Sequence, residues 1–118
     1  MSKRNRKSLI RTGTHAFPTV GKTEDGKLVV GGVYDFHQSL GMPLDFLFAQ
    51  LKELGIVPDW LDFYRMAIHN GMAHDRVITK IRDPIEDAWG VEFANSVCDT
   101  LDEIYNKQND ISNRARQR

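Results

Sequence analysis

His69 and His74 form the one local cluster among the four histidines of this sequence. Asp75 follows directly, so the run from His69 to Asp75 offers three possible ligands. Two histidines that bind one metal from a single helix are usually four residues apart, whereas these are five apart with a helix-breaking glycine between them. We therefore interpret the run as an exposed polar corner between two helices, and we predict neither a metal site nor a cofactor.

A nucleophile or an acid–base pair is the second chemistry to consider. Cys98 is the single cysteine. It falls on the apolar face of a predicted helix beside Asp99, where no base or positive field would activate it. Asp35 and His37 are two residues apart, and such residues do not share a helix face. The sequence predicts no catalytic residue, and we expect a protein that is not an enzyme.

Basic side chains gather at both ends of the chain. Residues 1–22 carry six lysines and arginines and no acid, residues 107–118 carry four against one acid, and residues 23–106 carry six against fifteen. The three net charges are therefore +6, +3 and −9, although the whole chain is neutral. Lysines and arginines that neutralise phosphates release counterions, so this segregation favours binding of nucleic acid or another polyanion.

Ten basic residues make up the predicted nucleic-acid-binding set. Eight lie in the terminal segments, and two lie one helical turn apart on a predicted helix, where an ordinary solvated face is the alternative interpretation. The set comprises Lys3, Arg4, Arg6, Lys7, Arg11, Arg76, Lys80, Arg114, Arg116 and Arg118. The ends lack aromatic residues apart from Phe17, so we expect little base stacking and little sequence preference.

Helices are the elements that must position these residues. Apolar spacing and end signals predict them over 43–54, 58–70, 73–82 and 84–106, with one or two further turns at 33–40. The break before Pro84 follows from an aspartate–proline start signal, and Trp89-Gly90 is a further candidate for a helix end or a kink. A turn sequence at 24–27 between β-favouring runs at 19–20 and 28–30 predicts a hairpin. The fold class is therefore mainly α, a compact bundle of three to four helices with a small N-terminal β-hairpin and basic flexible tails.

The domain division follows from the same pattern. We expect a basic flexible arm at 1–16, a helical domain with an N-terminal hairpin at 17–106, and a basic tail at 107–118 into which the last helix frays. A chain of this length can bury one core. Its predicted members are Leu47, Leu51, Trp60, Leu61, Tyr64, Ile68, Val97 and Leu101. One cysteine and no apolar run of membrane length predict a cytoplasmic protein without a membrane partner.

The helix predicted over 58–70 is apolar on nearly all sides. So few helices can rarely bury such a member alone, so we predict a protein interface at Trp60, Phe63 and Trp89. A helix-turn-helix interpretation of 47–67 fits in shape, but its second helix offers two acids against Arg65 and would repel phosphate.

These observations predict a small non-enzymatic binding protein. Its basic arms would contact nucleic acid or another polyanion, and its helical body would contact protein or a second copy. The alternative is an assembly protein whose basic tails pair with the acidic bodies of neighbouring subunits in an oligomer. The short chain, basic ends and helical body are similar in style to accessory proteins of bacteriophages. No family motif is recognised, and no residue role is carried over.

Overall fold

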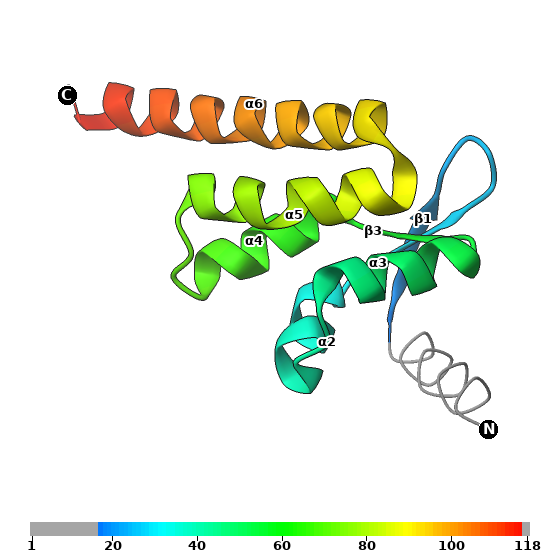
Figure 1. Ribbon diagram of the computed structural model, residues 1–118. Coiled ribbons are helices and arrows are strands. Elements are labelled where there is room, and N and C mark those ends of the chain that lie inside the picture. Colours follow the sequence, from blue (N-terminus) through cyan, green and yellow to red (C-terminus); the bar gives the residue numbers. More distant parts are fainter. Residues whose placement is uncertain (1–16, 117–118) are drawn as a thin grey trace.

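Five helices and a small sheet make up the computed structural model, which describes the backbone of residues 17–116 and the side chains of residues 17–109 (Figure 1). The elements follow in the order β1 (Thr19–Lys22), β2 (Leu28–Val30), α2 (Val33–Leu40), α3 (Leu44–Glu53), β3 (Ile56–Pro58), α4 (Trp60–His69), α5 (His74–Trp89) and α6 (Val91–Arg116). The prediction of a mainly helical chain with an N-terminal hairpin is confirmed. Within the described part of the chain, no helix is both long and apolar enough to cross a membrane.

The sheet has three strands in the order β1-β2-β3, one more than predicted. β1 and β2 form the expected antiparallel hairpin, and β3 pairs with β2 in parallel, with Val57 opposite Val29. Because neighbouring side chains of a strand point to opposite faces, Val29 and Val57 share one face of the sheet. Val30 and Ile56 lie on the other face and join the core.

The core is a single cluster drawn from all five helices and from the sheet. Five of the predicted members are buried as expected, namely Leu47, Leu51, Tyr64, Val97 and Leu101. The prediction is wrong for Ile68, which is 39% exposed, and Trp60 and Leu61 are only half-buried. The inner face of α4 is set by Phe63, Tyr64 and Ala67, and Ile68, one turn after Tyr64, lies in the exposed last turn of the helix.

The break between the last two helices lies at Gly90, and the prediction of a break before Pro84 is wrong. α5 continues through Pro84 because its apolar side chains before and after that residue bury on one face; these are Val77, Ile81, Ile85 and Ala88. Gly90 has φ of 99°, a conformation that side-chain-bearing residues rarely adopt, and α6 then turns back along α5 (Figure 1).

α6 is longer than expected, since it runs to Arg116 instead of fraying after Lys107. Among its residues up to 109, whose side chains are described, the last buried one is Leu101, and residues 105–109 are exposed. The C-terminal part of the helix therefore extends beyond the body (Figure 1). The predicted arm at 1–16 and the last two residues lie outside the described part.

Candidate functional site

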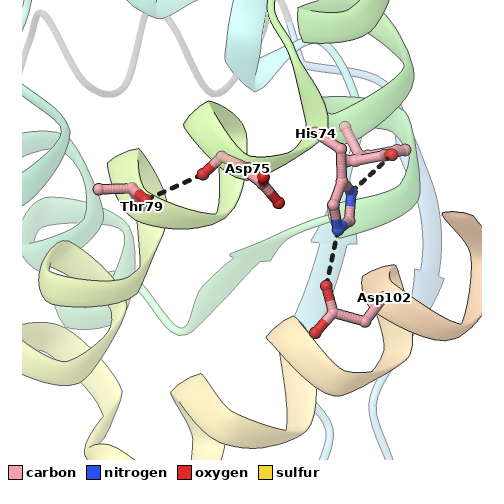
Figure 2. Close-up of polar contacts among 5 residues, drawn as sticks. His74, Asp75, Thr79 and Asp102 are labelled. Atoms are coloured by element: carbon pink, nitrogen blue, oxygen red, sulfur yellow. Dashed lines mark hydrogen bonds and ion pairs between the residues drawn. The ribbon is translucent and has the colours of Figure 1, made fainter.

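His74 is the centre of a polar cluster that joins three helices. It opens α5, its Nδ1 lies 2.8 Å from the hydroxyl oxygen of Tyr64 on α4, and its Nε2 lies 2.7 Å from Oδ1 of Asp102 on α6 (Figure 2). Tyr105, one turn from Asp102, stacks on the imidazole with ring centroids 4.1 Å apart. The His74 side chain is 8% exposed, so the prediction of an exposed corner is wrong for this residue.

The His74 cluster has the residue types of an acid–base relay, but its setting is structural. In the neutral ring, Nε2 donates to the carboxylate of Asp102, which can only accept, and Nδ1 accepts from the hydroxyl of Tyr64. Burial, followed by the nearby charges of Tyr105 and Asp102, raises the pKa of Tyr64, so the phenol stays protonated at neutral pH. Tyr64 is only 4% exposed, so its hydroxyl is not open to a substrate. The cluster therefore connects the three helices.

The other candidate residues for chemistry lie apart from His74. His69 is exposed at the end of α4 and Asp75 is exposed on α5, so the two do not close around His74. In the range that the structure describes, no three histidines, cysteines or acids are grouped to hold a metal ion. Thr79 donates a hydrogen bond to the backbone carbonyl of Asp75, which is ordinary helix-surface chemistry (Figure 2).

His37 and Cys98 both have structural roles. His37 donates from Nδ1 to the carbonyl of Met42, 2.6 Å away, and burial lowers the pKa of His37. Asp35 is exposed and is not its partner. Cys98 is buried on α6, and burial raises the pKa of its thiol, which disfavours the reactive thiolate.

Two of the ten predicted nucleic-acid-binding residues have described side chains. Arg76 and Lys80 lie together on the outward side of α5 and line a hollow of about 440 Å³ with Met72, Asp75 and Thr79. Neither forms an ion pair with another described residue. Asp75 borders the same hollow, so this part of α5 carries two cations beside one acid. The side chains of the other eight lie outside the described part.

The residues predicted for a protein interface belong to an aromatic cluster. Trp60 packs against Trp89 with ring centroids 5.8 Å apart and against Phe93 at 6.3 Å. Phe63 is only 1% exposed, so it belongs to the core and cannot contact a partner in this structure. Trp60 and Trp89 are half-buried and keep some exposed surface.

A groove of about 400 Å³ lies between the outer face of the sheet and α6. Its apolar lining comes from Val29 and Val57 on the sheet, Trp60 and Leu61 at the start of α4, and Phe93 and Val97 on α6. Hydroxyl groups of Thr23, Ser96 and Thr100 also border it. We call this the sheet–α6 groove. Sequence reasoning missed it because β3 was not predicted, and the apolar 93/97 spacing on α6 was assigned entirely to the core.

The helix-turn-helix alternative does not hold in the structure. Its proposed turn contains β3, and its second helix, α4, buries Phe63, Tyr64 and Ala67.

A comparison of the chain with protein-family models, with curated proteins and with solved structures finds no match to any of them.

Proposed function

We propose that this chain is a small non-enzymatic binding protein whose basic ends contact nucleic acid or another polyanion and whose helical body contacts protein. The observation that carries the proposal is the segregation of charge. The stretch 23–106 has a net charge of −9, whereas ten of the sixteen lysines and arginines lie in residues 1–22 and 107–118. An evenly mixed surface would serve solubility equally well.

The arrangement of the chain ends supports this function. The first described residue, Phe17, lies at the sheet, and the end of α6 lies at the opposite side of the molecule (Figure 1). Beyond Leu101 the helix carries no fully buried side chain among residues 102–109. The backbone positions of Arg114 and Arg116 therefore lie on a helical extension, where a polyanion would experience less repulsion from the acidic body.

The residue types favour a phosphate-bearing partner over an acidic protein surface. Arginine supplies six of the ten basic residues in these end segments, and its guanidinium binds phosphate through two parallel hydrogen bonds. A nucleic acid also gains free energy from counterion release, which an acidic protein of low charge density does not. The unpaired Arg76 and Lys80 would add to the same footprint from α5.

Matched double substitutions test the proposal. Fluorescence anisotropy of labelled DNA and RNA at about 50 mM salt would compare R4Q/R6Q with K52Q/R65Q, which removes the same charge from exposed positions of the body. We expect the arm variant to weaken binding about three- to tenfold and the body variant to have little effect. Equal effects would show that binding follows net charge alone and would contradict a role for the ends.

The assembly function is the second candidate, and the acidity of the body favours it. Basic tails would then pair with acidic bodies of neighbouring subunits, and purification would give a large oligomer that dissociates with salt and contains no nucleic acid. Co-elution of nucleic acid with the protein, removed by nuclease, would favour the polyanion-binding function instead.

A further inference from the structure

Acidic residues lie on α6 beside the face that lines the sheet–α6 groove. Glu92, Asp99 and Glu103 recur at helical spacing on α6, about a quarter turn from the residues that line the groove. All three are exposed, and none forms an ion pair with another described residue. An apolar groove with an unpaired acidic border fits a segment that carries bulky apolar side chains between positive charges.

The chain itself contains one such segment. Within residues 1–16, Leu9 and Ile10 are the one pair of adjacent large apolar residues, and they stand between Lys7 and Arg11. The groove, with a volume of about 400 Å³, is small for a ligand pocket, since such pockets measure roughly 300–1,000 Å³. Two aliphatic side chains suit this size. The two flanking cations match the acids on α6 in sign.

Chain length permits this docking within one molecule. Phe17 is fixed in the core, 6% exposed, with its ring 5.0 Å from that of Phe36. Leu9 lies eight positions before Phe17, and eight extended residue steps span up to about 29 Å. β1 leads in six steps from Phe17 to Thr23 at the groove border, a path of about 22 Å or less. Leu9 can therefore reach the groove of its own chain.

We propose that Leu9 and Ile10 bind in the sheet–α6 groove of the same chain, so that the acidic body competes with a polyanion for Lys7 and Arg11. This inference rests on the proposed polyanion-binding function. Tethering gives the segment an effective concentration of order millimolar, which favours its own groove over that of a second copy at micromolar protein. Because linkage is reciprocal, groove binding lowers polyanion affinity and polyanion binding releases the segment.

Spectra of full-length variants test the docking itself. We expect L9S/I10S, which keeps every charge, to shift the NMR signals of the Trp60 indole and of Phe93 and Thr100, whereas T12S/T14S should leave them in place. The shifts should not depend on protein concentration. Unchanged groove signals would overturn the proposal, and so would shifts that appear only at high concentration, because the occupant would then be a second copy.

Polyanion affinity tests the regulation with charge-matched variants. E92Q/D99N/E103Q removes the acidic border, and D35N/E53Q/D87N removes three exposed acids elsewhere on the body. We expect the first variant to bind labelled RNA about three- to tenfold more tightly than the second. Equal affinities would overturn the proposed competition. Absence of RNA binding by every variant would overturn the function proposed above, while the spectra would still decide whether the segment docks.

Discussion

At the scale of single residues, His74 shows how one polar side chain can hold three helices. Its ring bridges Tyr64 on α4 and Asp102 on α6, and Tyr105 covers its face. These contacts hold α6 beyond Leu101, where Ile104 is half-buried and residues 105–109 are exposed. His74 therefore anchors the helix that carries the basic C-terminal positions.

Removal of this anchor should lower stability. We expect His74→Ala to reduce the free energy of unfolding by about 2–3 kcal/mol, because the buried hydroxyl of Tyr64 would lose its partner and the ring would leave a cavity. His69→Ala, at an exposed position, should change it by less than about 0.5 kcal/mol. Urea denaturation measures both, and equal losses would contradict the anchoring role.

His37 should make stability depend on pH. Burial lowers its pKa in the folded chain below the ordinary value of 6.5. The unfolded chain then binds the proton more readily, so the free energy of unfolding should fall as pH drops below 6.5 and should level off below the folded pKa. His37→Gln, whose amide can still donate to the carbonyl of Met42, should lose less stability between about pH 7 and 5. An identical loss in both proteins would refute this role of His37.

Residue types alone predicted the buried face of α3 but not the environment of the histidines. Leu47 and Leu51 repeat at helical spacing, and both are fully buried. His74 has no such pattern, because its partner Asp102 is 28 residues away and is brought near only when α6 folds back on α5. The Tyr64 and Asp102 contacts could not be derived from local spacing.

At the scale of elements, α5 shows that packing can outweigh a start signal. Pro84 cannot donate a hydrogen bond within the helix, and Asp83 and Glu86 fit a helix start, yet Ile81 and Ile85 bury on the same face across this point.

The strand β3 was not predicted from the sequence, for a related reason. A three-residue strand that ends in Pro58 exists only because β2 pairs with it in parallel across two intervening helices.

A pair of substitutions locates the break between α5 and α6. We expect Pro84→Ala to raise the free energy of unfolding by about 1–3 kcal/mol, because it restores a helical hydrogen bond in a continuous helix. Gly90→Ala should lower it by about 1–3 kcal/mol, since φ of 99° strains any residue with a side chain. Thermal denaturation of both variants measures these changes. Destabilisation by Pro84→Ala together with tolerance of Gly90→Ala would place the break at Pro84 instead.

At the scale of the whole molecule, the proposed polyanion-binding function depends on where charge lies relative to the folded body. The sequence alone shows basic ends and an acidic middle. The structure adds that α6 carries the C-terminal positions away from the body, which the expected fraying after Lys107 did not anticipate. It also reveals the sheet–α6 groove, which requires β3 and the reversal at Gly90 together.

The salt dependence of nucleic-acid binding is the sharpest test of the polyanion-binding function. Fluorescence anisotropy with labelled DNA and RNA over a series of salt concentrations should give a log–log slope near −3 to −5, as expected when about four to six phosphates are neutralised. A variant that lacks residues 2–11 should keep the helical circular-dichroism spectrum and lose much of that slope. No binding by the full-length protein at about 50 mM salt would contradict the polyanion-binding function.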